Sequence, residues 1–246
     1  MGLADQSGPE GSNVRPLKRR ELVVGLGAAV AWPLAVPSQP LERTGRGRAL
    51  AEYPVTDLLI NSDAFPSLTR RLGTLLEKAE ALFGPRDKTF TLLGIEFHEG
   101  PNRLNYPNVE RDQIVIELSM GATRNRDQAL FQLAHETVHI LAPVNVGATT
   151  VLEEGLATYF SLTAPDFANP TYAQRSEESL TGKFQPYRDA LDDVRALLFM
   201  DPTVVSRIRQ TNELFGSITV RRLREAAPHC PTKVATRLAR TFTMEK

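Results

Sequence analysis

Two histidines and a glutamate in this sequence stand at a spacing that suits metal chemistry. They are His135, Glu136 and His139, within residues 131–140, FQLAHETVHI. On an α-helix, residues four apart lie about one turn apart on the same face, so both imidazoles can reach a single cation. Glu136 projects close to that face, where it can lie over a water molecule without binding the metal itself. Two histidines that hold zinc, beside a carboxylate that takes a proton from water, predict metal-assisted hydrolysis.

The neighbouring residues predict the helix that this motif requires. Asn125 or Asp127 can cap its start, and Pro143 ends it shortly after Leu141. In between, apolar residues recur at steps of three and four and predict a buried face: Leu130, Leu133, Ala134, Val138 and Leu141. The alternative interpretation is a pair of histidines on an ordinary amphipathic helix that binds no metal.

A catalytic zinc site also needs a third protein ligand and an open position. Residues 150–160, TVLEEGLATYF, predict a second helix that could supply this ligand from Glu153 or Glu154. Thr150 and Glu153 have the spacing of a capping box, which assigns Glu153 to the start of the helix and leaves Glu154 as the ligand. Gly155 lacks a side chain, so we expect it to let the two helices approach each other closely.

Together, HETVH and the downstream string EGLATYF resemble the gluzincin branch of the zinc metallopeptidases, which includes thermolysin-like and aminopeptidase-like enzymes. The resemblance covers roughly residues 88–163. It implies one Zn²⁺ per chain, held by His135, His139 and Glu154, with Glu136 as general base. It also implies hydrolysis of peptide bonds in a peptide or protein substrate.

In gluzincins, a tyrosine or histidine donates a hydrogen bond to the oxyanion that develops during cleavage. Three residues of the C-terminal half are candidates for this role: Tyr172, Tyr187 and His229. Thr158 stands one turn after Glu154, where thermolysin-like members have an aspartate that orients the first histidine. Two other interpretations stay open, namely a catalytically silent metallopeptidase-like binding domain and a metal-dependent amidase with a non-peptide substrate.

The elements around the motif predict an α+β fold. We expect a helix from about Ser67 to Phe83, strands at residues 89–98 and 113–119, and a loop at residues 102–112. The resemblance implies a zincin-like half-domain, a small sheet plus the metal-binding helix, in which an edge strand beside the zinc holds an extended peptide. A helical subdomain should follow, with helices at residues 189–199, 202–210, 219–226 and 232–242 after a loop-rich connection at 164–184.

The N-terminal part of the sequence carries a different signal. Residues 18–36, KRRELVVGLGAAVAWPLAV, place a basic cluster before about fifteen mainly apolar residues, fewer than the roughly twenty that a membrane-spanning helix needs. The segment resembles a bacterial twin-arginine export signal, although a buried helix of the folded domain is an alternative. We therefore expect an exported protein, periplasmic or secreted, that contacts the membrane only if the segment is not cleaved.

Three parts are expected along the chain. Residues 1–40 would be a disordered start plus the signal segment, residues 48–163 the zincin-like core, and residues 164–246 the helical part of the same domain. The 29 basic and 29 acidic residues balance, so bulk charge favours neither nucleic acid nor an anionic membrane as a partner. The single cysteine, Cys230, excludes an intramolecular disulfide.

Overall fold

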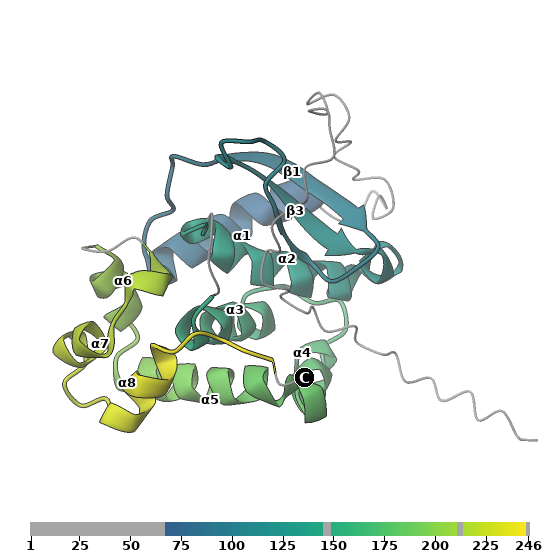
Figure 1. Cartoon of the computed structure of the whole chain (residues 1–246). Helices are drawn as coiled ribbons and strands as arrows, with labels where there is room; N and C mark the ends of the chain where they lie inside the picture. Colours follow the sequence, from purple (N-terminus) through teal and green to yellow (C-terminus); the bar gives the residue numbers. More distant parts are fainter. Residues whose placement is uncertain (1–66, 145–148, 211–213, 245–246) are drawn as a thin grey trace, which may run out of the picture.

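The structure, a computed structural model, describes residues 67–144, 149–210 and 214–244 (Figure 1). The expected export signal and the domain boundary at residue 48 lie outside these residues. The elements, in chain order, are α1 (Leu68–Phe83), β1 (Thr91–His98), β2 (Arg103–Asn105), β3 (Gln113–Ser119), η2 (Met120–Arg124), α2 (Arg126–Leu141), α3 (Val151–Thr163), α4 (Tyr172–Glu178), η3 (Gly182–Phe184), α5 (Gln185–Met200), α6 (Val204–Arg209), η4 (Phe215–Ser217), α7 (Val220–Ala226) and α8 (Thr232–Leu238). The α+β fold class is confirmed. No helix in the described ranges combines the length and apolar character that crossing a membrane demands.

A three-stranded sheet stands over the metal-motif helix. The strand order is β1-β3-β2, so β3 is central, parallel to β1 and antiparallel to β2. Strand β2 lies inside residues 102–112, which we expected to be a loop, so that prediction is wrong for Arg103–Asn105. Three residues are too few for an alternating pattern to be visible, and β2 exists because Leu104 and Asn105 pair with Ile116 and Val115 of β3.

Helix α2 is the centre of the molecule. Figure 1 shows the sheet above α1 and α2, with α3 beneath α2 and α5 beneath α3. Every residue of α2 from Asp127 to Leu141 is buried, so the helix has no solvent-exposed face. Our expectation of a single buried face was therefore too narrow. Polar groups on such a helix cannot reach water, so any that finds no partner inside the protein costs free energy.

The start of α2 is capped by Asn125, one of the two residues expected there. The side chain of Asn125 accepts a hydrogen bond from the Gln128 amide at 3.1 Å. Asp127, the other candidate, accepts instead from the amides of Ala168 and Asn169 at 2.7 and 2.8 Å. Asp127 therefore joins the start of α2 to the segment that follows α3.

The end of α2 is joined to α1 and α6 by a buried arginine. Arg209, which is 1% exposed, donates to the carbonyl oxygen of Leu141 at 2.9 Å. It also donates to three carbonyl oxygens at the end of α1, those of Phe83, Gly84 and Pro85, at 2.8–3.1 Å. These carbonyls have no partner within their own helices, so the guanidinium satisfies both helix ends at once.

The C-terminal helices pack into the same hydrophobic core as the sheet and α2. Leu223 of α7 and Leu238 of α8 belong to one buried cluster with Leu68 and Leu72 of α1. All four helices expected after residue 185 are present within a few residues of their expected bounds. The connection at residues 164–184, which we expected to be rich in loops, also contains two short elements that were not predicted, α4 and η3. Helix α4 is short and polar, and the packing of Tyr172 against the rings of Phe131 and Phe167 holds it in place.

Gly155 permits a close approach of two helices, but not of the two that we expected. A Cβ atom at this position would lie 2.5 Å from the carbonyl oxygen of Ala190 and 2.6 Å from Cγ2 of Val194. Both neighbours belong to α5, so the close contact joins α3 to α5 rather than α3 to α2. Gly155 therefore affects the site indirectly, because it lets the helix that carries Glu153 and Glu154 pack closely against α5.

Candidate metal centre

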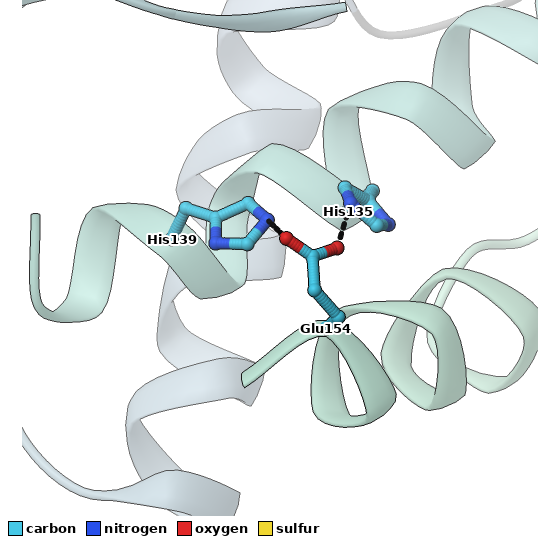
Figure 2. Close-up of side chains that lie close together, drawn as sticks. All are labelled: His135, His139 and Glu154. Carbon is cyan, nitrogen blue, oxygen red and sulfur yellow. Dashed lines mark ion pairs between the residues drawn. The ribbon is translucent and has the colours of Figure 1, made fainter. Parts of the chain in front are cut away.

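The three predicted ligands, His135, His139 and Glu154, lie close together between α2 and α3 (Figure 2). The Oε2 atom of Glu154 lies 3.4 Å from Nε2 of His135, and its Oε1 atom lies 3.8 Å from Nε2 of His139. One ligand atom from each residue lies within 4.8 Å of the other two. In tetrahedral zinc sites with bonds of about 2.0–2.1 Å, ligand atoms are about 3.3–3.4 Å apart. The distance from Glu154 to His135 equals this spacing and the distance from Glu154 to His139 is slightly longer, so the three residues could hold a metal ion. No other such group of three occurs within the described ranges.

The carboxylate of Glu154 is held in its charged form. Burial opposes ionisation, but the imidazoles of His139 and His135 and the hydroxyl of Thr149 outweigh it, so the pKa of Glu154 lies below its ordinary value. The Thr149 hydroxyl donates to Oε1 of Glu154 at 2.7 Å. A buried anion facing two imidazole nitrogens is a strong electrostatic attractor for a cation.

Each ring nitrogen of His139 lies near a different carboxylate. Its Nε2 atom faces Glu154, while its Nδ1 atom lies 2.8 Å from Oε1 of Glu153. Burial lowers the pKa of His139, but Glu154 and Glu153 outweigh burial and raise the pKa to about 10. A metal ligand must be a neutral imidazole, so metal binding at this site would release a proton.

The expected capping box is only half present at the start of α3. Thr150 accepts a hydrogen bond from the amide of Glu153 at 3.2 Å, as expected. The carboxylate of Glu153 does not complete the box, because it turns toward His139, and its second oxygen has no partner among the described residues. The assignment of the Glu153 side chain to capping was therefore wrong.

Glu136 is buried beside the two histidines and is held by a residue that sequence reasoning missed. Nδ2 of Asn102 donates a short hydrogen bond to Oε1 of Glu136. Burial raises the pKa of Glu136 above its ordinary value, although His139, His135 and Asn102 oppose this shift. Asn102 directly precedes β2, and because that strand was not predicted, no sequence signal pointed to it.

A second missed residue, Tyr106, follows the edge strand as Asn102 precedes it. Both are buried, and Leu104 between them packs against the core. Burial raises the pKa of Tyr106 well above its ordinary value; the nearby guanidinium of Arg111 opposes this, and the charges of Glu153 and Glu136 add to it. The phenol therefore lies within electrostatic reach of the candidate centre.

The three candidates for an oxyanion donor lie in different places. The fully buried ring of Tyr187 packs edge-on against His135, with centroids 6.3 Å apart. Tyr172 packs instead between Phe131 and Phe167 in a second core cluster. His229 is exposed in the turn between α7 and α8. Of the three, only Tyr187 contacts a residue of the candidate centre.

The orienting partner of His135 is not provided by the side chain one turn after Glu154. Thr158 is fully buried, and its hydroxyl has no hydrogen-bond partner among the described residues. Likewise, Nδ1 of His135 has no partner within the described part of the chain. The two imidazoles therefore differ, since a carboxylate holds His139 and the described neighbours hold His135 by packing.

Comparisons with protein-family models, with curated proteins and with solved structures find no match to this chain. The geometry of the site and the chemistry of its residues are therefore what indicate a function.

Proposed function

We propose that this protein is a zinc-dependent peptidase in which His135, His139 and Glu154 hold one Zn²⁺ and Glu136 is the general base. The observation that carries the proposal is the convergence of three buried ligand atoms within 4.8 Å. A buried carboxylate and two imidazoles placed so closely have little purpose in a packed core, because burying polar groups costs free energy unless they are paired. A divalent cation satisfies all three at once.

The chain provides the proton transfer that hydrolysis requires. A zinc ion held by the three residues would supply Lewis acidity and would make water a nucleophile near neutral pH. Glu136 takes a proton from the attacking water and gives it to the nitrogen of the leaving amine. Burial raises the pKa of Glu136, which brings this carboxyl closer to the working range of a general base. Asn102 orients the carboxylate by donating to Oε1, which leaves Oε2 for the proton.

The position of β2 supports a peptide as the substrate. The strand is at the edge of the sheet and pairs on one side with β3. The residue just before it, Asn102, contacts the general base. A peptide that adds to such an edge in extended form would have its main chain held by hydrogen bonds close to Glu136. Those bonds do not read side chains, so the proposal names peptides as a class and no particular sequence.

The first experiment is the zinc content of the full chain and of its Glu154→Ala variant. We expect one zinc per chain in the wild type and a large loss of affinity in the variant, because the variant removes the only anionic ligand. Wild-type protein that binds no zinc after reconstitution would refute the proposal.

The second experiment separates catalysis from metal binding. Glu136→Gln keeps the volume of the side chain and the hydrogen bond from Asn102 but cannot accept the proton. It should retain one zinc per chain and lose turnover of a peptide library. An active variant would show that Glu136 is not the base. Cleavage confined to non-peptide amides would instead indicate an amidase, and zinc binding without any hydrolysis would indicate a binding domain.

A further inference from the structure

We infer that Glu153 is a positioning residue, whose carboxylate holds the imidazole of His139 in the tautomer and orientation that the metal centre needs. The inference depends on the zinc site of the proposed function and adds a role for a residue that is neither ligand nor base.

The hydrogen bond between the two side chains decides which nitrogen of His139 can bind a metal. Nδ1 lies 2.8 Å from Oε1 of Glu153, and a carboxylate can only accept, so Nδ1 carries the hydrogen. In the neutral ring, the lone pair is then on Nε2, the atom that faces Glu154 at 3.8 Å. The contact therefore selects the tautomer with its free electron pair directed at the proposed metal position.

The same hydrogen bond restricts the rotation of the ring. His139 comes from α2 and Glu153 from the first turn of α3, so the contact crosses between the two helices that supply the ligands. His135 has no equivalent, because its Nδ1 atom has no partner among the described residues. Removal of the Glu153 carboxylate should therefore free one of the two histidines.

A purely structural role explains the Glu153 carboxylate poorly. Its side chain is 1% exposed, and Oε2 has no partner within the described part of the chain. The start of α3 does not need this carboxylate, because Thr150 caps it by accepting from the backbone amide of Glu153. A buried, half-satisfied carboxylate is costly to the fold, and its hydrogen bond to a metal-ligand histidine gives it a function.

Two substitutions of similar volume test the inference in the full-length protein. Glu153→Gln keeps an oxygen that accepts from Nδ1, whereas Glu153→Met fills the same space without an acceptor. The zinc dissociation constant of each is measured by competition with a chromophoric chelator. We expect Glu153→Met to bind zinc about 10- to 100-fold more weakly than wild type, and Glu153→Gln to recover most of that loss.

Two further measurements separate positioning from ligation and from general destabilisation. At saturating zinc, Glu153→Met should still bind one ion per chain, because the three ligands remain. Its cobalt-substituted form should show altered visible absorption, which reports ligand geometry, while that of Glu153→Gln should resemble wild type. Thr150→Ala is the matched control, since it removes the cap of the same helix turn and should lower stability without changing the zinc dissociation constant.

The outcomes distinguish this inference from the proposed function. If wild type binds zinc and Glu153→Met binds it equally well, the positioning role is wrong and the zinc site stands. Equal losses in Glu153→Met and Glu153→Gln would also overturn it, because the acceptor would then be irrelevant. If wild type binds no zinc, the proposed function itself fails, and the positioning role fails with it.

Discussion

Gly155→Ala should lower the stability of the protein and weaken zinc binding, because it disturbs the contact between α3 and α5. The added Cβ would lie 2.5 Å from the carbonyl oxygen of Ala190, and ordinary contact begins at 3.4 Å, so the two helices must separate by 3.4 − 2.5, about 0.9 Å. Overpacking of this kind costs about 3 kcal/mol at the upper end of its range, and the helix propensity of alanine offsets about 1 kcal/mol. The expected net loss is about 2 kcal/mol, or roughly 4–8 °C in Tm.

The same displacement should weaken zinc binding. Helix α3 carries Glu154, and metal–ligand distances tolerate only about 0.2 Å of deviation. A shift of 0.9 Å in the seat of this helix, the 3.4 − 2.5 Å above, is several times larger than that tolerance. We therefore expect a larger zinc dissociation constant, which means weaker binding. The lower stability is measured separately, by urea denaturation with a chelator present.

Gly73→Ala is the matched control for the same substitution on another helix. A Cβ at Gly73 of α1 has no heavy atom within 4 Å, so only helix propensity changes. This variant should gain up to about 1 kcal/mol of stability and bind zinc as wild type does. If Gly155→Ala proves as stable as Gly73→Ala, with unchanged zinc affinity, the argument that α5 seats the metal-binding helix is refuted.

Three other predictions concern different parts of the molecule. Arg209→Met should lower the free energy of unfolding by about 3 kcal/mol or more in urea, because the carbonyls of Phe83, Gly84 and Pro85 lose the guanidinium donor and that of Leu141 keeps only the Asp87 amide. A loss below about 1 kcal/mol would contradict this. Asn102→Ala should reduce kcat about tenfold at unchanged zinc content, because Glu136 loses the hydrogen bond that orients it; unchanged kcat would rule out that role. Burial raises the pKa of Tyr172 to about 12. The buried neutral phenol therefore contributes to the free energy of unfolding fully below about pH 10, and this contribution is lost between about pH 10 and 12. Between about pH 10 and 12, the free energy of unfolding of Tyr172→Phe should therefore fall by up to about 2 kcal/mol less than that of wild type, measured by denaturation at each pH. Equal losses in the two proteins would contradict this prediction.

The local elements were predictable where one sequence pattern was long enough. Helix α1 runs from Leu68 to Phe83 with Ser67 as its cap, and β3 matches the expected strand at residues 113–119. Strand β2 and helix α4 were missed, because elements of three and seven residues carry too few repeats of a pattern. Both depend on partners distant in the sequence, β3 in the first case and the ring of Phe131 in the second.

The sequence by itself determined which residues form the candidate metal centre. The four-residue spacing of His135 and His139 is a helical property, and the choice of Glu154 followed from local rules at the start of α3. In the structure, Glu154 is the residue of the two that faces both histidines, whereas the capping role assumed for the Glu153 carboxylate was wrong. The α2 helix alone sets the spacing of His135 and His139, so a local rule can pair these two residues. Glu154 lies on α3, and the capping rule that led to it assigned the wrong role to the carboxylate of Glu153.

Only the tertiary structure decided what surrounds those residues. The hydrogen bond from Asn102 to Glu136 spans 34 positions in the sequence, and the Glu153–His139 contact joins two helices. The seating of α3 by Gly155 depends on α5, a helix that begins 30 residues later. Such contacts depend on where the chain folds back on itself. Helical and strand periodicities describe only neighbours along the chain, so they carry no information about which distant side chains will meet.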